Sequence, residues 1–322
     1  MSRRIVVTRA IPQAALSLLR EGGDVWVSPH DRPLTDAELY EAVAGADAVV
    51  SLLHDRVDGA LLDAAGPQLR VVANVAVGYD NVDVAAVTAR GVVVTNTPGV
   101  LTEATADLAM GLLLAVTRRL GEGERLLRAA TPWAWAMDFM LGSGLQDKTL
   151  GIVGLGGIGQ ATARRARAFG MAIAYSGRRR ADPAVEEELG GARWMDLDEL
   201  LSVADVISLH CPLTPETRHL ISADALAAMK PTAYLVNTAR GPVVDEAALV
   251  EALRSRTIAG AGLDVFEREP EVHPGLLELD NVVLAPHLGS ATVETRTEMA
   301  LLAARNALAV LAGEAPLTPV RP

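Results

Sequence analysis

The sequence contains a single cysteine and few aromatic residues. Cys211 has no second thiol in the chain, which excludes an intramolecular disulfide and fits a reducing compartment. Aromatic residues make up 3% of the chain and hydrophobic residues 50%, so Ala, Val and Leu must fill most of the core. With 322 residues the chain is longer than one compact core usually needs, and two domains are expected.

The sequence also lacks a basic excess and a long apolar run. It carries 29 Lys and Arg against 40 Asp and Glu, a net charge of −11, which argues against binding to nucleic acid. The longest apolar stretch, around Leu108 to Val116, is too short to span a membrane. The N-terminal apolar run is too short for a signal peptide and is interrupted by Arg9. We therefore expect a cytoplasmic protein without membrane or nucleic-acid partners, and no metal site is predicted.

Short β-branched runs alternate with segments of helical period along the chain. This alternation predicts an α/β protein in which helices cover both faces of parallel sheets. The predicted helices include Pro12–Arg20, Asp58–Ala65, Thr102–Arg128, Gly159–Phe169, Glu246–Arg254 and Thr292–Gly313. The predicted strands are Ile5–Thr8, Ala48–Ser51, Val71–Asn74, Val92–Thr95, Leu150–Val153, Ala172–Ser176, Val206–His210, Ala233–Asn237, Ala261–Asp264 and Val282–Ala285.

A glycine-rich turn joins one predicted strand to a predicted helix. The turn has the form G-x-G-x-x-G, in which the first glycine permits the sharp bend, the second admits a pyrophosphate and the third lets the helix pack on the strand. The helix N-terminus adds N–H donors and a positive dipole. The turn therefore predicts dinucleotide binding by Gly154, Leu155, Gly156, Gly157, Ile158 and Gly159.

The residues after the next strand predict which dinucleotide binds. A cofactor without a 2′-phosphate usually meets an acidic residue here, but the position holds Ser176, followed by Gly177 and three arginines. A hydroxyl with guanidinium groups suits a 2′-phosphate. NADP(H) is therefore expected in preference to NAD(H), which stays possible. Arg178 and Arg179 are the preferred ligands, and Arg180 is expected to point to water.

The chain carries six motifs in the order in which they occur in one family. Through them it resembles the D-isomer-specific 2-hydroxyacid dehydrogenases along essentially its whole length, in particular the glyoxylate and hydroxypyruvate reductase branch. One departure is Gly157, where relatives often carry Arg. The motifs are the glycine turn, Val77 to Asp83 (VGYDNVD), His210 to Thr214 (HCPLT), Asn237 to Gly241 (NTARG), Gly262 to Pro270 (GLDVFEREP) and Pro286 to Ser290 (PHLGS).

The resemblance implies two Rossmann-like domains, each with a doubly wound parallel sheet, and a cleft between them. Residues 1–98 plus 288–322 would form a discontinuous substrate-binding domain, and residues 99–287 the dinucleotide-binding domain. Such proteins are usually homodimers joined through the cofactor domains, and the segment from Trp133 to Gly144 would belong to that interface.

Two side chains are candidates for the chemistry of a 2-keto acid. Arg240 follows a strand and can bind a carboxylate with two parallel hydrogen bonds, although an arginine here could equally cap a turn. His287 also follows a strand and can exchange protons near neutral pH, although a lone histidine is more often structural. The motif match favours the catalytic role for both.

A carboxylate beside His287 would fix its tautomer and favour the imidazolium form. Glu267, Glu269, Glu271 and Glu278 are all close in sequence, so composition does not choose among them. The resemblance selects Glu269.

The resemblance implies further roles near the cofactor and the substrate. It implies that Asp264 binds the carboxamide group of the nicotinamide. Other implied cofactor contacts are Thr105, Cys211, Pro212, Thr217, Thr238, Ala239 and Gly289. The implied substrate contacts are Leu53, Val77, Gly78 and Ser290, together with Arg240 and His287, and His54 is an additional candidate.

The predicted reaction is the reduction of a small 2-keto acid, glyoxylate or hydroxypyruvate, to the D-2-hydroxy acid, with hydride from the nicotinamide and the proton from His287. Pyruvate or a larger apolar 2-keto acid is the alternative substrate. Phosphoglycerate is disfavoured because the loop from Ser51 to Asp55 has no Lys or Arg, and a formate dehydrogenase because that branch has Gln at position 269. From another class, a non-catalytic dinucleotide sensor similar to transcriptional corepressors stays open.

Overall fold

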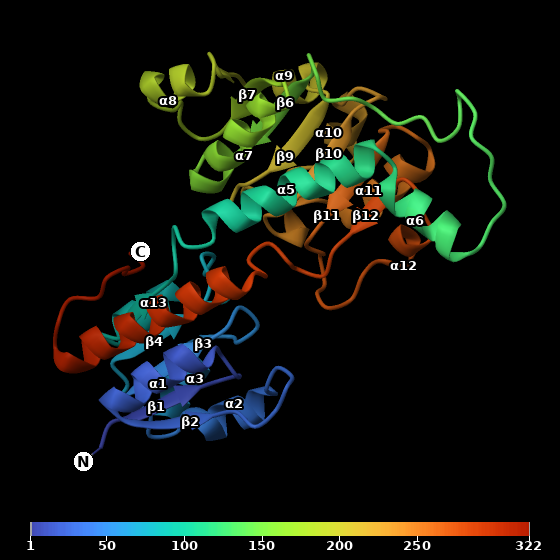
Figure 1. Ribbon diagram of the computed structural model, residues 1–322. Coiled ribbons are helices and arrows are strands. Elements are labelled where there is room, and N and C mark those ends of the chain that lie inside the picture. Colours follow the sequence, from blue (N-terminus) through green and yellow to red (C-terminus); the bar gives the residue numbers. More distant parts are fainter. Residues whose placement is uncertain (1, 322) are drawn as a thin grey trace. The chain divides into compact units, whose positions relative to one another are not determined.

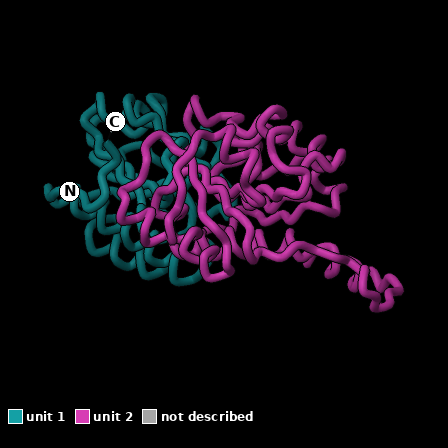
Figure 2. Tube along the Cα trace, turned by 90° about the horizontal axis from the view of Figure 1, so that it is seen from above, with its two compact units in different colours: residues 1–101, 291–322 teal, residues 102–290 magenta. Residues whose placement is uncertain are grey.

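The computed structural model describes residues 2–321, which divide into two compact units. Unit 1 comprises residues 1–101 and 291–322, and unit 2 comprises residues 102–290 (Figure 2). In both units short strands alternate with helices (Figure 1). Each unit builds its own parallel sheet, which confirms the predicted fold class.

Unit 1 contains a five-stranded parallel sheet in the order β2-β1-β3-β4-β5. The strands are β1 (Arg4–Val7), β2 (Asp24–Val27), β3 (Ala48–Ser51), β4 (Val71–Asn74) and β5 (Val93–Thr95). The helices are α1 (Gln13–Gly22), α2 (Asp36–Val43), α3 (Gly59–Ala65), α4 (Val84–Ala89) and α13 (Val293–Ala312). Alternate strand residues, such as Val6, Val49 and Val72, pack against α2 and α3. The C-terminal α13 packs on α1 and contacts β3, β4 and β5.

Unit 2 contains a seven-stranded parallel sheet in the order β12-β11-β10-β9-β6-β7-β8. The strands are β6 (Thr149–Val153), β7 (Ala172–Ser176), β8 (Arg193–Trp194), β9 (Val206–Leu209), β10 (Tyr234–Asn237), β11 (Gly260–Leu263) and β12 (Val282–Leu284). The helices are α5 (Thr102–Thr117), α6 (Leu120–Arg128), α7 (Gly157–Ala168), α8 (Pro183–Glu188), α9 (Leu197–Val203), α10 (Ala223–Ala228), α11 (Glu246–Arg254) and α12 (Pro274–Leu277), with a 3₁₀ turn at Gly241–Val243.

The two faces of the unit 2 sheet bury different residues of the same strands. Leu150 and Ile152 of β6 pack in the cluster that includes residues of α5 and α7, whereas Val153 packs with residues of α9, α10 and α11. The strand order reverses between β6 and β9, since β7 and β8 continue on one side of β6 and β9 to β12 on the other. Ligands of doubly wound sheets bind beyond the carboxyl ends of the strands at such a reversal.

The predicted strands are confirmed, one predicted helix is wrong, and the start of α2 carries a local cap. Thr35 and Glu38 form a capping box at the start of α2, where the Glu38 backbone N–H donates to Thr35 and the Thr35 backbone N–H donates to Glu38. The predicted strands all occur within one residue at each end. The predicted helix Thr102–Arg128 is instead two helices, because Arg119 adopts a left-handed conformation with φ of 54° and separates α5 from α6.

Within residues 2–321, none of the helices combines the length and the apolar content that crossing a membrane requires. The same residues contain no cluster of three or more His, Cys, Asp or Glu side chains that could hold a metal ion.

Candidate active site

The glycine turn after β6 has the geometry of a phosphate cradle. Gly154 has a φ of +94°, and a Cβ at this position would lie 2.9 Å from the Cys211 amide nitrogen. A Cβ on Gly159 would lie 2.4 Å from the Gly154 carbonyl oxygen, so the third glycine brings α7 close to the turn. Among the residues that the structure describes, no atom lies within 4 Å of a Cβ placed on Gly156, and no side chain caps α7. The first amides of α7 are therefore available to an anion.

Two buried polar atoms, in the loops that follow β9 and β10, have no hydrogen-bond partner among the residues that the structure describes. They are the Thr238 hydroxyl and Nδ1 of His210. Buried polar groups normally have partners, so an orphaned hydroxyl at the carboxyl end of β10 fits a ligand that supplies one. The cradle, the uncapped helix and the Thr238 hydroxyl together fit a nicotinamide dinucleotide.

The loop after β9 lies directly against the glycine turn. The His210 amide donates to the Val153 carbonyl oxygen at 2.8 Å, and the Thr217 hydroxyl donates to the Pro212 carbonyl oxygen at 2.7 Å. Burial raises the pKa of the Cys211 thiol to about 11, so this thiol stays protonated and is not a nucleophile near neutral pH. The loop thus serves as a wall of the cradle.

The neutral His210 ring makes the stability of unit 2 depend on pH. Burial lowers its pKa to about 4, whereas an unfolded imidazole titrates near 6.5. Between these two values the unfolded chain binds more protons, so stability falls as the pH falls through this window. A loss of about 2 kcal/mol between pH 7 and pH 5 is expected from this group. Thermal unfolding at pH 7 and at pH 5 measures this loss. If a His210→Gln variant lost as much stability as the wild type between these two pH values, His210 would not be its cause.

Ser176, at the carboxyl end of β7, lies beside the cradle. Its carbonyl oxygen accepts a hydrogen bond from the Gly154 amide at 2.9 Å. Arg180, expected to point to water, instead forms an ion pair with Glu186 at 2.7 Å. Arg178 and Arg179 make no hydrogen bond or ion pair within residues 2–321, and their predicted contact with a 2′-phosphate stays a prediction.

His287 and Glu269 are brought together in the turns that follow β12 and β11. His287 Nδ1 and Glu269 Oε2 lie 2.8 Å apart, and Glu269 Oε1 accepts a hydrogen bond from the Phe266 amide at 3.0 Å. Since the carboxylate accepts a hydrogen bond from Nδ1–H, the other ring nitrogen, Nε2, is left to exchange a proton with a ligand.

Glu269 keeps its negative charge in this setting. Burial by itself would raise its pKa. The hydrogen bond and charge of His287, the Phe266 amide and the charge of Arg240 outweigh burial, and the pKa of Glu269 is lowered. The carboxylate is therefore ionised at neutral pH, and Arg240 is near enough to contribute to this.

Asp264 organises the turn that carries His287. Its carboxylate accepts hydrogen bonds from the amides of Leu288 at 2.6 Å and Gly289 at 2.8 Å, and its carbonyl oxygen accepts the His287 amide at 2.8 Å. The Thr105 hydroxyl donates to the Gly289 carbonyl oxygen at 3.1 Å. Burial, opposed by these bonds, raises the pKa of Asp264. Its contact with the nicotinamide carboxamide stays a prediction.

Arg240 ends a rigid turn after β10. Asn237 holds this turn at both ends, since its Nδ2 donates to the Arg240 carbonyl oxygen and its Oδ1 accepts the Ala239 amide, each at 3.0 Å. A Cβ on Gly241 would lie 1.9 Å from the Phe266 carbonyl, so only glycine lets this turn approach the segment that carries Glu269. The Arg240 turn and the Glu269 turn therefore lie in contact.

The structure also distinguishes Glu269 from Glu267. Glu267 pairs with a different histidine, His219, at 2.8 Å. Glu246 was not predicted as part of the site. Its buried carboxylate accepts hydrogen bonds from the amides of Glu267 at 2.8 Å and His273 at 3.0 Å and so fixes the Glu269 segment from both sides. These bonds connect residues more than twenty positions apart, a distance at which spacing in the sequence carries no signal.

In unit 1, the predicted substrate contacts lie on two loops that are joined to each other. Asn74 Nδ2 donates to the Gly78 carbonyl oxygen at 3.0 Å, and Asn81 Nδ2 donates to the Leu52 carbonyl oxygen at 3.2 Å. These bonds fix the loops after β3 and β4, which carry Leu53 and Val77. Their contact with substrate stays a prediction, as does that of Ser290.

An imidazole–carboxylate pair, a nearby guanidinium and a dinucleotide cradle define an NAD(P)-dependent dehydrogenase of 2-hydroxy acids. The chain belongs to the D-isomer specific 2-hydroxyacid dehydrogenase family, whose NAD binding domain matches residues 110–289.

Similar proteins cover nearly all of the chain. A glyoxylate reductase of Thermococcus onnurineus is 51% identical over 323 residues, which cover 99% of this chain and 96% of the relative. The crystal structure of a glyoxylate reductase from Paecilomyes thermophila has a TM-score of 0.89 at 36% identity, covering 99% of this chain and 98% of that one. A glyoxylate/hydroxypyruvate reductase of Sinorhizobium meliloti, described as NADPH-dependent and solved with NADP and malonate, has a TM-score of 0.86 at 39% identity, covering 99% and 97%.

Proposed function

We propose that this enzyme reduces glyoxylate and hydroxypyruvate to the corresponding 2-hydroxy acids and uses NADPH in preference to NADH. The observation that carries the proposal is the hydrogen bond between His287 and Glu269 beside Arg240. The relatives named above, which act on glyoxylate or hydroxypyruvate by their names, support the choice of substrate.

In the proposed mechanism each of the three side chains has one task. Arg240 binds the substrate carboxylate with two N–H groups and polarises the neighbouring carbonyl. His287 gives the proton on Nε2 to the carbonyl oxygen, and Glu269 stabilises the imidazolium before this transfer and fixes the ring through Nδ1. The bound cofactor, held by the glycine turn and by Thr238, would supply the hydride to the carbonyl carbon.

Initial rates with purified protein test the substrate assignment. NADPH is combined in turn with glyoxylate, hydroxypyruvate, pyruvate and a branched 2-keto acid, and kcat/KM is expected to be highest for the first two. A higher kcat/KM for the branched acid would show that the substrate is a larger apolar acid. Binding of NADPH without turnover of any of the four would favour the dinucleotide sensor.

The cofactor preference is expected to depend on Arg178 and Arg179. No carboxylate occupies the end of β7, where Ser176 stands, and two guanidinium groups follow it, which suits a 2′-phosphate. Replacing both arginines by Ala should raise KM for NADPH about tenfold or more and leave KM for NADH within about twofold. Arg254→Ala, on α11, is the control for loss of an exposed positive charge elsewhere in unit 2. Equal kcat/KM for both cofactors in the wild type would contradict the preference.

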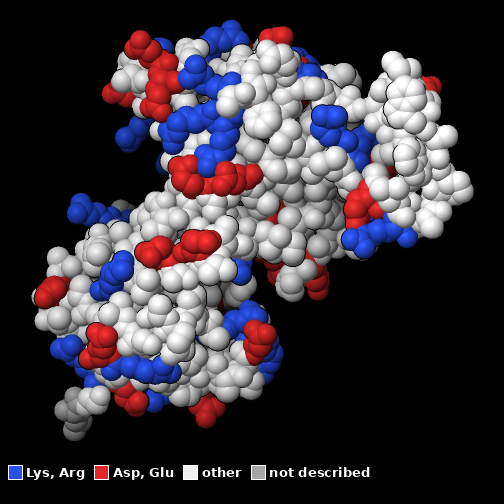
Figure 3. Space-filling model, viewed as in Figure 1, with Lys and Arg blue, Asp and Glu red and all other residues white. Residues whose placement is uncertain are grey.

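We also propose that the protein forms a homodimer through the segment from Trp133 to Gly144, which follows α6. This segment runs out from the body of unit 2 and shows few charged residues on the face in Figure 3. The side chains of Trp135 and Met137 are 75% and 80% exposed, an apolar surface typical of interfaces. A Trp135→Glu, Met137→Glu variant should sediment as a monomer at concentrations where the wild type is a dimer. Leu277→Glu, at another exposed apolar site, is the control, and a variant that stays dimeric would contradict this interface.

A further inference from the structure

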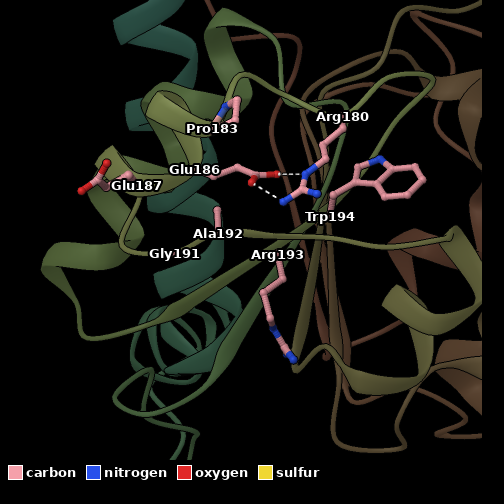
Figure 4. Close-up of a pocket in the computed structure, with 8 residues that line it drawn as sticks. All are labelled: Arg180, Pro183, Glu186, Glu187, Gly191, Ala192, Arg193 and Trp194. Atoms are coloured by element: carbon pink, nitrogen blue, oxygen red, sulfur yellow. Dashed lines mark hydrogen bonds and ion pairs between the residues drawn. The ribbon is translucent and has the colours of Figure 1, made fainter.

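The loop between β7 and α8 carries three consecutive arginines, and one of them is bound to the next helix. Arg180 donates from Nε to Glu186 Oε1 at 2.8 Å and from Nη2 to Glu186 Oε2 at 2.7 Å (Figure 4). The Glu186 side chain is only 10% exposed, whereas that of Arg180 is 65% exposed. Arg180 and Glu186 line a pocket of about 570 Å³ together with Trp194. The third guanidinium therefore turns toward α8, and its charge is neutralised there.

A buried tyrosine completes this arrangement and fixes the end of the loop. The Tyr175 hydroxyl donates to Glu186 Oε1 at 2.6 Å and accepts a hydrogen bond from the Ala181 amide at 2.8 Å. Tyr175 belongs to β7 and is 1% exposed, so the hydroxyl is anchored in the core of unit 2. We call Tyr175, Arg180 and Glu186 the loop clamp. It ties the loop from Gly177 to Ala181 both to the strand before it and to the helix after it.

The Glu186 carboxylate of the clamp stays ionised at neutral pH. The hydrogen bonds from Arg180, and then from Tyr175, lower the pKa of Glu186 to about 2. The carboxylate therefore stays ionised and keeps both partners at neutral and at mildly acidic pH.

The first arginine of the loop, Arg178, is not held by the clamp. The pKa of Glu216, in the loop after β9, is lowered by the hydrogen bond from Thr214, by its own backbone and, in addition, by the charge of Arg178. Glu216 lies one residue from Thr217, in the loop that forms a wall of the cradle. Arg180 is thus engaged by α8, whereas Arg178 makes no hydrogen bond or ion pair within residues 2–321.

We infer that Glu186 and Tyr175 are positioning residues for cofactor selectivity. They hold the loop from Gly177 to Ala181 in the one conformation that presents Arg178 and Arg179, and not Arg180, to the 2′-phosphate of NADPH. The inference rests on the proposed preference for NADPH. A loop ordered before binding loses less conformational entropy when the ligand arrives, and only NADPH carries the group that these arginines bind.

A single isosteric substitution separates this role from a direct contact. Glu186→Gln removes the charge that holds Arg180 but keeps the size of the side chain. The clamp predicts that KM for NADPH rises about tenfold, while KM for NADH changes less than about twofold and kcat for either cofactor is unchanged. If Arg180 itself bound the phosphate, Gln would release it, and KM for NADPH would stay the same or fall. That result would overturn the inference.

Two further variants control the measurement. Tyr175→Phe keeps the buried ring but removes the hydroxyl, so the clamp predicts a change in the same direction and of smaller size. Glu188→Gln breaks an ion pair between the same helix, α8, and Arg164, which is on α7, and should change neither KM. An equal rise of KM for NADPH and NADH in Glu186→Gln would indicate a general loss of structure and would overturn the positioning role.

Amide hydrogen exchange distinguishes failure of this inference from failure of the cofactor preference. In the cofactor-free protein, exchange over residues 177–181 should be faster in Glu186→Gln than in the wild type and unchanged in Glu188→Gln. A wild type with equal kcat/KM for NADPH and NADH contradicts the preference, and exchange then decides whether the clamp orders the loop. A wild type that prefers NADPH, with unchanged exchange and KM in Glu186→Gln, overturns the clamp alone.

Discussion

Replacing His287 by Ala is expected to lower kcat by about 10³-fold and to change KM for the 2-keto acid by only a few-fold. Loss of a positioned proton donor typically costs 10² to 10⁴ in rate, and the transfer occurs only on the way to the transition state. Its partner Glu269 lies 2.8 Å away and is held by the Phe266 amide. Glu269→Gln should therefore cost less, about 10 to 10²-fold, because it disturbs the orientation and charge of the donor without removing it.

The protein contains a matched control for this experiment. His219 and Glu267 form a second imidazole–carboxylate pair with the same separation of 2.8 Å, in the same unit. His219→Ala should lower kcat less than tenfold, since no chemical step is assigned to that ring. Steady-state kinetics with NADPH and glyoxylate measures both variants. If His219→Ala costs as much as His287→Ala, or if His287→Ala turns over at a near-normal rate, His287 is not the proton donor.

The sequence predicts the elements of this fold best where strands are buried. The predicted strands correspond to runs such as Val71–Asn74 and Val206–Leu209, in which every residue is buried and most are β-branched or aliphatic. Two strands were not predicted. The first, β2, begins with Asp24 and is partly exposed at the edge of its sheet, and the second, β8, has only two residues. No residue of either strand is buried, so both lack the apolar run that predicts a buried strand.

Helix ends were predictable where a residue type carries the signal. Thr35 and Glu38 mark the start of α2, and Gly91 with a φ of +71° follows the end of α4. The break between α5 and α6 has no such mark, because Arg119 adopts the left-handed conformation there although it has a Cβ. An ion pair between Arg119 and Glu122 at 2.6 Å stabilises the start of α6.

In the candidate site, too, some residues were predicted from the sequence and others were not. Arg240 and His287 were predicted because each follows a strand and matches a motif, and parallel strands place their carboxyl ends at one edge of the sheet. Glu269 was selected by its motif alone. The loop clamp was not predicted. Tyr175 reads as a strand residue of the core and Glu186 as a solvated residue of a short helix, and only the turn between them brings the phenol and the carboxylate to 2.6 Å.

Replacing Arg240 by Ala is expected to lower kcat/KM by about 10³ to 10⁴-fold, with a rise in KM and a fall in kcat. The guanidinium is assigned two roles, since it binds the carboxylate in the ground state and polarises the carbonyl as negative charge develops on its oxygen. Arg240→Lys should recover only part of the loss, because an ammonium keeps the charge but not the planar fork.

Arg218 provides the control for this charge. It lies in the same unit, its side chain is 54% exposed, and its pair with Glu267 at 3.1 Å has no assigned part in the reaction. Arg218→Ala should leave KM for glyoxylate within about twofold, the range expected for an exposed ion pair. The decisive measurement is the division of the effect between KM and kcat. An Arg240→Ala enzyme with an unchanged KM would show that the carboxylate binds elsewhere, and one with an unchanged kcat would show that Arg240 binds the substrate without polarising the carbonyl.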